Sequence, residues 1–226
     1  MAEPIALDAR LRAIAGLVMQ AVGQKAQPCV ADVGCDHGYL SIHLLQTGTA
    51  SHVYASDVRQ GPLSSAKRNA EIYGITDKID FFLSDGVQNL PRDFDTLVCA
   101  GMGGDTMISI LSAAPWLKTD GYRLILQCQS KTPLLRRYLS ESGWVISRET
   151  VLRDGRFLYT VMEALWQPDA PKLTAGQWYF SPALCRCTAP EADEYYRWVT
   201  DGLRLAVRHR PDGENQKALA ELEEMK

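Results

Sequence analysis

Three aspartates that end short apolar segments are the residues of this sequence best suited to bind a ligand. Asp32, Asp57 and Asp85 end such segments in VADVG, HVYASD and FFLSD. Asp57 follows Gly34 by 23 residues, close to the distance at which an acid reaches the ribose hydroxyls of a nucleoside lying across a parallel sheet. Taken alone, Asp57 could instead cap the next helix, and Asp85 with Gly86 could form a simple turn. Three acids at three successive segment ends favour a nucleoside site, with Asp85 and Gly86 near the adenine edge.

The loop after the first segment, DVGCDHG, distinguishes between kinds of nucleotide ligand. Gly34 allows a tight turn and Gly38 lets the next helix pack closely, but a dinucleotide loop would have a further glycine where this chain has Asp36. A carboxylate there repels a diphosphate and attracts a sulfonium or ammonium group. S-adenosylmethionine carries both of these cations and no phosphate. The loop therefore favours S-adenosylmethionine over a nicotinamide dinucleotide, although its two glycines alone would also fit a purely structural turn.

A glycine-rich stretch, AGMGG, follows the fourth apolar segment. Gly101, Gly103 and Gly104 leave the backbone open, so this loop could admit a flat base and offer it amide hydrogens. Because the crevice beyond the strand ends is where ligands meet in such sheets, we expect the methyl acceptor to lie here. A glycine-rich helix start is the alternative explanation.

These residues have to be positioned by alternating strands and helices. Short runs rich in Val, Ile, Leu, Tyr and Phe alternate with helical segments expected over 39–46, 61–73, 106–113 and 132–142. Such alternation predicts parallel strands with right-handed crossovers, and hence a doubly wound α/β sheet. The later runs WVISRET and LYTVMEA are too close together for a crossover helix. We therefore predict that they form an antiparallel pair at the sheet edge.

Helical segments flank this unit at both ends. Residues 7–18 carry apolar side chains at helical spacing before the first strand. Residues 166–182 are punctuated by Pro and Gly, which predicts a linker and an entry turn. Two further helices, one from Glu191 and one over Asn215–Met225, should fold back as an antiparallel hairpin. We accordingly expect one domain over 1–165, and a linker with a helical domain over 166–226.

The charge balance limits how the chain could bind nucleic acid. The net charge is −3 and the sequence pI is about 5.8, so RNA binding would have to rest on local basic patches. Candidate residues for such patches are Arg10, Arg12, Arg59, Lys67, Arg68, Lys131, Arg136 and Arg137, followed by Arg197, Arg204, Arg208 and Arg210 near the C-terminus. Solvated helix faces and packed helices with charged flanks are the alternative explanations.

The six cysteines indicate a reduced protein. They are mostly isolated within apolar runs, as expected of core cysteines rather than of a disulfide framework. No secretory signal and no run of about 18 apolar residues is visible, so we expect a soluble, cytoplasmic protein. Among Cys35, His37, Cys185 and Cys187, only the last two approach the spacing of metal ligands, and zinc sites usually separate paired cysteines by two residues. We therefore expect no metal site.

The order of the motifs adds a family resemblance. ADVGCDHGYLSI, ASDVRQGPL, AGMGG and LILQCQS resemble, in this order, the bacterial tRNA (adenine-22-N1)-methyltransferase family, the TrmK group. The resemblance covers roughly residues 7–165, and DHGYL together with AGMGG makes it specific. It implies a Rossmann-like class I methyltransferase domain followed by a small helical, coiled-coil-like domain. It also implies S-adenosyl-L-methionine as cofactor, tRNA as partner, and methyl transfer to N1 of an adenine.

The resemblance also implies roles for individual residues. Asp32, Gly34 and Gly38 would surround the methionine end of the cofactor, with Asp57 at its ribose. Asp36 is the predicted catalytic residue, which would hydrogen-bond the adenine or stabilise its cationic product. The predicted cofactor-binding set is Asp32, Gly34, Asp36, His37, Gly38, Asp57, Val58, Asp85, Gly86, Ala100 and Gly101, and the predicted substrate-binding set is Arg10, Met102, Gly103 and Gly104. A small-molecule methyltransferase and a non-catalytic RNA-binding protein remain as alternatives.

Overall fold

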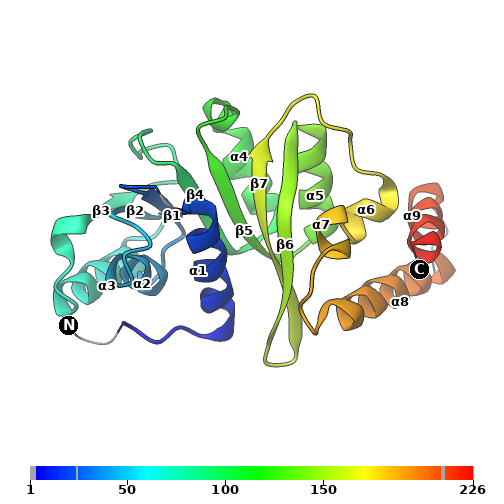
Figure 1. Ribbon diagram of the computed structural model, residues 1–226, viewed down its shortest axis with the longest axis horizontal. Coiled ribbons are helices and arrows are strands. Elements are labelled where there is room, and N and C mark those ends of the chain that lie inside the picture. The colour runs from blue at the N-terminus through cyan, green and yellow to red at the C-terminus, as the bar shows by residue number, and fades with distance from the viewer. Residues whose placement is uncertain (1–3, 24, 210–211, 226) are drawn as a thin grey trace.

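A seven-stranded sheet forms the centre of the computed structural model, which describes residues 4–23, 25–209 and 212–225 (Figure 1). The strands are β1 (Cys29–Val33), β2 (His52–Asp57), β3 (Ile79–Leu83), β4 (Thr96–Gly103), β5 (Arg123–Ser130), β6 (Trp144–Asp154) and β7 (Phe157–Trp166). Their order is β3-β2-β1-β4-β5-β7-β6, with β1 to β5 parallel and β7 antiparallel to both of its neighbours. The predicted mostly parallel, doubly wound sheet with an antiparallel edge is confirmed.

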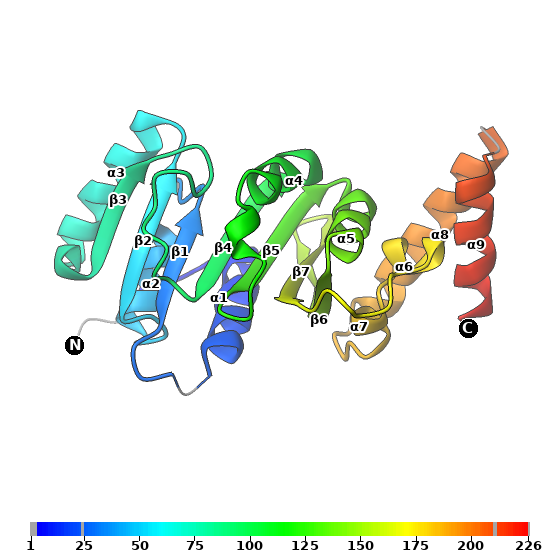
Figure 2. The ribbon, with the colours of Figure 1, turned by 90° about the horizontal axis from the view of Figure 1, so that it is seen from above.

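Five helices cover the two faces of the sheet, as the view from above shows (Figure 2). They are α1 (Ala9–Val22), α2 (Tyr39–Gln46), α3 (Gln60–Ile72), α4 (Gly104–Ser112) and α5 (Thr132–Glu141), and short 3-10 turns occur at Thr76–Lys78 and Pro115–Leu117. The first three helices pack with one face of the sheet into a single hydrophobic cluster, whereas α4 and α5 pack with the other face into a second. Central strands are therefore buried on both sides, which is why their sequences are almost continuously apolar.

The C-terminal segment contains more helix than the sequence predicted. Residues 166–182 were expected to be a linker, but they include α6 (Ala175–Tyr179), and α7 (Pro182–Cys185) follows directly. A capping box explains the start of α6, because Thr174 and Gln177 satisfy each other's backbone amides. The predicted pair of long helices is present as α8 (Ala192–His209) and α9 (Gly213–Glu224). They fold back on one another, and the Tyr196 hydroxyl donates to the Leu222 carbonyl over 2.5 Å.

A buried ion pair joins this segment to the sheet. The Arg136 guanidinium on α5 lies 2.7 Å from the Glu149 carboxylate on β6, and both side chains are buried. The same guanidinium donates to the backbone carbonyls of Trp178 and Tyr179, each over 2.9 Å. Arg136 was among the residues expected to meet RNA, and that expectation is wrong, because the side chain is fully enclosed.

The cysteines only partly match the expectation of a core location. Cys35, Cys99 and Cys128 are buried, Cys29 and Cys187 are half-buried, and Cys185 is exposed, with all six thiols free. Within the described residues, no three or more His, Cys, Asp or Glu side chains are grouped so that they could hold a metal ion. None of the described helices combines the length and the apolar character needed to cross a membrane.

Candidate functional site

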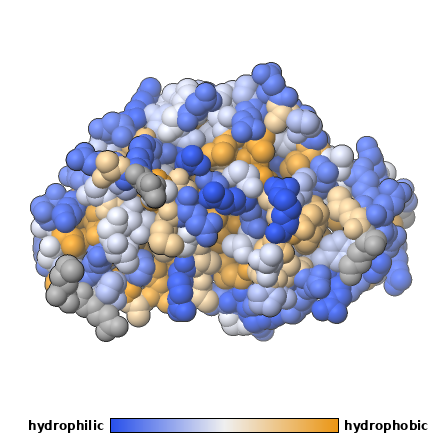
Figure 3. Space-filling model, in the orientation of Figure 1, coloured by the Kyte–Doolittle hydropathy of each residue, from blue (hydrophilic) through white to orange (hydrophobic). Residues whose placement is uncertain are grey.

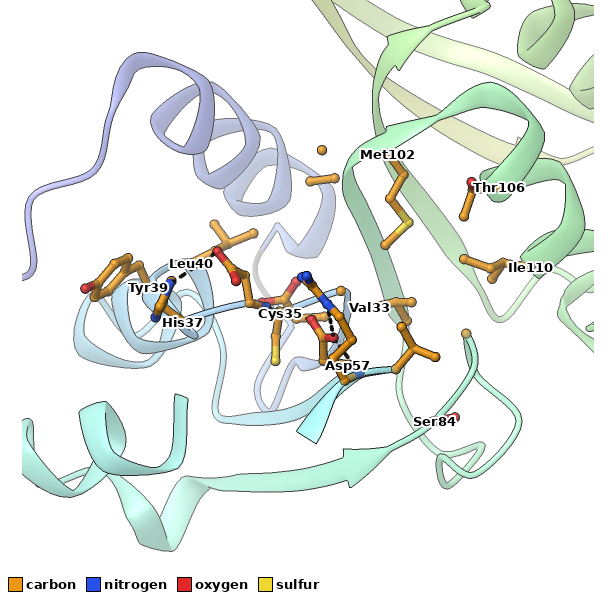
Figure 4. Close-up of a pocket in the computed structure, with 18 of the residues that line it drawn as sticks. Val33, Cys35, His37, Tyr39, Leu40, Asp57, Ser84, Met102, Thr106 and Ile110 are labelled. Atoms are coloured by element: carbon orange, nitrogen blue, oxygen red, sulfur yellow. Dashed lines mark hydrogen bonds and ion pairs between the residues drawn. The ribbon is translucent and has the colours of Figure 1, made fainter. Parts of the chain in front are cut away.

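A cavity of about 440 Å³ opens beyond the carboxyl ends of the parallel strands. It lies where the chain order reverses between β1 and β4, which is the usual ligand position in a doubly wound sheet. Figure 4 shows Met102, Thr106 and Ile110 on one side of the cavity and Cys35, His37 and Asp57 on the other. The predicted site residues that line it are Arg10, Asp32, Gly34, Asp36, His37, Asp57, Val58, Asp85, Gly86, Ala100, Gly101 and Met102.

The first loop is a tight turn that only glycine can form at Gly34. Its φ is 75°, and the amides of Gly34 and Cys35 both donate to the Ser56 carbonyl, over 2.8 and 2.9 Å. A Cβ atom at Gly34 would lie 2.3 Å from the methyl carbon of Met102. Because that carbon is the far end of a flexible side chain, the positive φ rather than this contact is what requires glycine at this position.

Asp36 holds an unusual backbone conformation at the mouth of the cavity. Its φ is 50°, in the left-handed region that Asp tolerates better than most residues. The Asp36 amide donates to Asp57 Oδ2 over 3.3 Å, which fixes the loop to the end of β2. The Asp36 side chain is 61% exposed and its carboxylate lies 3.8 Å from the His37 ring nitrogen Nε2. The carboxylate is thus carried on a constrained backbone while remaining accessible to a ligand.

Asp57 is a buried carboxylate with preset partners. It is 5% exposed, and besides the Asp36 amide it accepts the Arg59 amide at Oδ1 over 2.9 Å. The alternative in which Asp57 caps the next helix is wrong, since Arg59 occupies the N-cap position of α3. Backbone amides therefore orient this carboxylate toward the cavity before any ligand binds.

Asp32 is buried more deeply, between β1 and α2. It is 3% exposed, and the Ser41 hydroxyl donates to its Oδ2 over 2.6 Å. Burial raises the pKa of Asp32; the hydrogen bond from Ser41 lowers it in part and the nearby Asp57 raises it, and together these effects bring it to about 6. Since Asp32 also lines the cavity, its ionisation is sensitive to any charge that a ligand brings.

The third loop contributes backbone as well as a carboxylate. Asp85 is exposed and lines the cavity, next to Gly86 with a φ of 60°. A Cβ atom at Gly86 would lie 2.9 Å from Ile110 Cγ2 on α4. The Asp-Gly turn that the sequence allowed is therefore present, and it packs against α4, the helix that follows the AGMGG stretch.

The end of β4 departs from regular strand geometry. Its register with β5 shifts on both sides of Met102, and Gly101 adopts a φ of 74°. The buried side chain of Gln127 holds this bulge, because its Oε1 accepts the Gly101 amide over 3.1 Å and Arg10 Nη1 over 3.4 Å. Arg10 thereby reaches the cavity from α1, and Met102 extends into it from β4.

Three predicted residues do not line the cavity. Gly38 packs against α3, where its Cβ would lie 3.0 Å from Ala66 Cβ. Gly103 and Gly104 face the β5–α5 connection, where Cβ atoms would lie 3.1 Å from Ser130 Oγ and 2.8 Å from the Lys131 carbonyl. The alternative of a glycine-rich helix start describes Gly104 correctly, because α4 begins there, two residues before the predicted Thr106.

Several lining residues were missed by the sequence analysis. They are Leu11, Val33, Cys35, Tyr39, Leu40, Arg59, Ser84, Thr106, Ile110 and Gln129. Some carry a signal in hindsight, because Thr106 and Ile110 are four residues apart on one face of α4. Gln129 belongs to the quoted motif LILQCQS, whose polar residues within an apolar strand mark a strand end near a ligand.

Only part of the predicted basic surface is available. Arg10 and Arg59 line the cavity, whereas Arg204 on α8 is engaged by Asp201 and Glu223 over 2.9 and 2.8 Å. Arg210 lies outside the described residues. The cationic residues nearest to the cavity are thus on α1 and after β2.

Comparisons with known proteins agree with this geometry. A family model described as a methyltransferase domain matches residues 7–162. A candidate tRNA methyltransferase of Mycoplasma pneumoniae is 35% identical over 184 residues, which cover 79% of this chain and 81% of that protein. The tRNA (adenine(22)-N(1))-methyltransferase of Bacillus subtilis is 32% identical over 136 residues, covering 60% of this chain and 57% of that protein. Among solved structures, a candidate tRNA (m1A22) methyltransferase of Streptococcus pneumoniae in complex with S-adenosyl-L-methionine has a TM-score of 0.82 at 26% identity, covering 97% and 99% of the two chains.

Proposed function

Because the chain belongs to the bacterial tRNA (adenine-22-N1)-methyltransferase family, the TrmK group, we propose that it transfers a methyl group from S-adenosyl-L-methionine to N1 of adenine 22 in tRNA. The observation that carries this proposal is the cavity itself. Three carboxylates from successive strand ends line it beside Arg10 and Met102, with no glycine cradle for a diphosphate. The alternative of a nicotinamide-dependent enzyme has no support in such a site.

The residues that line the cavity suit this cofactor. Asp57, oriented by two backbone amides, would bind the ribose hydroxyls, and Asp85 with Gly86 would lie at the adenine. Asp32 and Asp36 would surround the cationic methionine end, since carboxylates favour a sulfonium and an ammonium group. The cavity volume of about 440 Å³ is within the range of small-molecule sites. When bound, S-adenosylmethionine supplies an electrophilic methyl group.

The reaction asks for alignment more than for acid–base chemistry. N1 of adenine has a lone pair at neutral pH, so the protein need not remove a proton before attack. The chain must hold the extruded base with N1 in line with the methyl–sulfur bond and exclude water. The Met102 side chain and the bulged backbone at Gly101 would contact the base, and Asp36 would offset the positive charge that develops on it.

Unmodified tRNA and labelled donor provide the direct test. Incubation should methylate one adenine at N1, identified by digestion and mass spectrometry. Transfer to small acceptors with none to tRNA would instead establish a small-molecule methyltransferase. Calorimetric titration that detects no binding of S-adenosylmethionine would leave a non-catalytic RNA-binding protein. We also propose a cytoplasmic location, as expected of a protein that acts on tRNA, and fractionation of cells tests it.

A further inference from the structure

A second cavity of about 380 Å³ lies between the methyltransferase sheet and the C-terminal helices. The connection from β5 to α5, the start of β7 and one face of α8 form its walls. We propose that this cavity binds an unstacked nucleobase of the RNA substrate, from a nucleotide close to the methylated adenine. This inference rests on the proposed function, because it assigns part of the tRNA contact to a place outside the methyl-transfer site.

Aromatic side chains give the cavity its binding surface. Tyr159, Tyr179, Tyr195 and Trp198 all line it. Trp198 is 62% exposed, although its ring lies 5.7 Å from that of Tyr195, so a large apolar face is left open to solvent. Proteins recognise unpaired RNA bases by stacking them on such rings, whichever base is present. An exposed tryptophan at the mouth of an aromatic-lined cavity is suited to this use.

The two cavities adjoin each other at the end of β5. Gln129 lines both of them, with Lys131 and Cys128 on the side of the second cavity. A base in the second cavity would therefore belong to a nucleotide near the one whose adenine enters the first. Continuity with the acceptor site is the reason for assigning the second cavity to the same RNA rather than to an unrelated ligand.

The charge at the rim also fits a nucleic acid. Lys131 lines the cavity, and its amine is paired with the exposed carboxylate of Asp105. An exposed ion pair contributes little to stability, so the amine can exchange Asp105 for a phosphate at small cost. On the face seen in Figure 3, hydrophobic side chains gather over β5 to β7, whereas the C-terminal helices at its margin are mostly hydrophilic. A purely hydrophobic partner would match the rings but not the cation.

Gly202 allows the cavity to be filled without removing any contact. It lines the cavity from α8, and nothing lies within 4 Å of the position that a Cβ would take. Gly202→Leu should place a side chain in the mouth of the cavity, while replacing a glycine inside a helix tends to stabilise it. We expect KM for tRNA to rise about tenfold with an unchanged or higher melting temperature, and Gly202→Ala, the matched control, to behave like the wild type.

Trp198 provides a second, independent variant. Trp198→Ala should raise KM for tRNA about tenfold and leave the affinity for S-adenosylmethionine unchanged, whereas Trp198→Phe keeps a stacking face and should lose much less. Leu205→Ala is the control, because Leu205 is 55% exposed on the same helix but does not line the cavity. Equal KM values for Trp198→Ala and Leu205→Ala would overturn the proposal.

Substrates lacking one base test the idea on the unaltered protein. A series of tRNAs with a single abasic site near the methylated adenine should contain one position that raises KM as much as Trp198→Ala does. Combining that tRNA with Trp198→Ala should add no further loss, because both changes remove the same stack. Fully additive losses, or a change in sedimentation of Trp198→Ala that signals a broken contact between copies, would overturn the proposal. If the wild-type protein methylates tRNA normally while these tests fail, the base-binding cavity is excluded and the proposed function stands. If the wild-type protein transfers no methyl group to tRNA, both proposals are excluded.

Discussion

Asp32 has to be ionised to attract a cation, yet it is placed where ionisation is costly. Its pKa of about 6, raised from the ordinary value of 3.8, means that the folded protein binds a proton at Asp32 more tightly than the unfolded chain does. The stability that this group contributes is therefore fully present below about pH 4 and is lost as pH rises through 6. A cationic ligand would lower the pKa of Asp32 again, because it favours the charged carboxylate.

We accordingly expect the affinity for S-adenosylmethionine to fall several-fold between pH 7.5 and pH 5, because protonated Asp32 no longer attracts the ligand. Asp32→Asn should bind it weakly at both pH values, and above pH 6 its free energy of unfolding should exceed that of the wild type by on the order of 1–3 kcal/mol, which raises its melting temperature. Calorimetric titration at both pH values, with thermal melting of both proteins, measures these effects. Parallel pH profiles for the two proteins would contradict this role of Asp32.

Asp36 is predicted to act on the acceptor more than on the cofactor. Asp36→Ala should lower kcat for tRNA methylation by about tenfold or more, with a much smaller effect on the affinity for S-adenosylmethionine. Alanine is also disfavoured at a φ of 50°, so Asp36→Asn is the better-matched variant, because asparagine tolerates this conformation and removes only the charge. Single-turnover assays under saturating cofactor measure the chemical step. Wild-type turnover in Asp36→Asn would exclude a role for the carboxylate charge.

At the scale of elements, β4 and β5 together shape the acceptor side of the site. The bulge at the end of β4 is stabilised from β5 by Gln127, whose amide also donates to the Cys128 carbonyl over 3.1 Å. The buried Gln127 side chain thus links α1, through Arg10, with the bulge at Gly101.

Gln127→Leu should remove this link and leave the Gly101 amide without an acceptor. We expect a loss of about 1 kcal/mol in the free energy of unfolding, because a half-buried donor loses its acceptor in the protein. We also expect kcat/KM for tRNA to fall more than the affinity for S-adenosylmethionine, since Arg10 and Gly101 are on the acceptor side. Urea unfolding and steady-state assays measure the two effects, and Gln129→Leu, on an exposed neighbour, controls for the polarity change in the unfolding experiment.

The sequence predicted these elements where periodicity reflects burial. The parallel strands, four crossover helices and the antiparallel pair were all predictable, since their apolar patterns are set by a sheet buried on two faces. Helices α6 and α7 were missed, because five- and four-residue helices within Pro- and Gly-containing sequence carry no periodicity. Their positions are set by tertiary contacts such as those of Arg136.

The site was predictable where a residue type has one function and not where it has several. Aspartates at strand ends have few structural reasons to be there, and all three line the cavity. Glycine permits close packing as readily as ligand approach, so Gly38, Gly103 and Gly104 could not be distinguished from Gly101. Gln127 and the aromatic cavity depend on side chains brought together from distant segments, which local spacing cannot reveal.

At the scale of the whole molecule, hydrophobic packing continues across the proposed division at residue 165. The third cluster, around Phe180, Tyr195 and Leu203, includes Val151 from β6. Glu149, two residues before Val151 on the same strand, also accepts a hydrogen bond from the Ser181 hydroxyl over 2.6 Å. The helical segment therefore supplies partners to charges that belong to the sheet.

Arg136→Ala should consequently be one of the most damaging single changes. It leaves Glu149 buried without its counter-ion, and we expect a loss of about 3–5 kcal/mol in the free energy of unfolding. The ion pairs of the neighbouring Arg137, with Glu141 and Glu214, are exposed, and its guanidinium lies 4.5 Å from the centre of the Trp178 ring, so Arg137→Ala should cost much less. Denaturant unfolding of both variants tests the contrast, and similar losses for the two would show that the buried network is not a main source of stability.

The buried guanidinium also sets an order of events during synthesis on the ribosome. Arg136 and Glu149 emerge before the carbonyls of Trp178 and Tyr179 and the hydroxyl of Tyr195, which complete the hydrogen bonds of the guanidinium. Until those residues leave the exit tunnel, the nascent chain holds a charged pair that is only partly enclosed. The cofactor-binding half can therefore collapse early, but the native state is reached only after Tyr195 has left the tunnel.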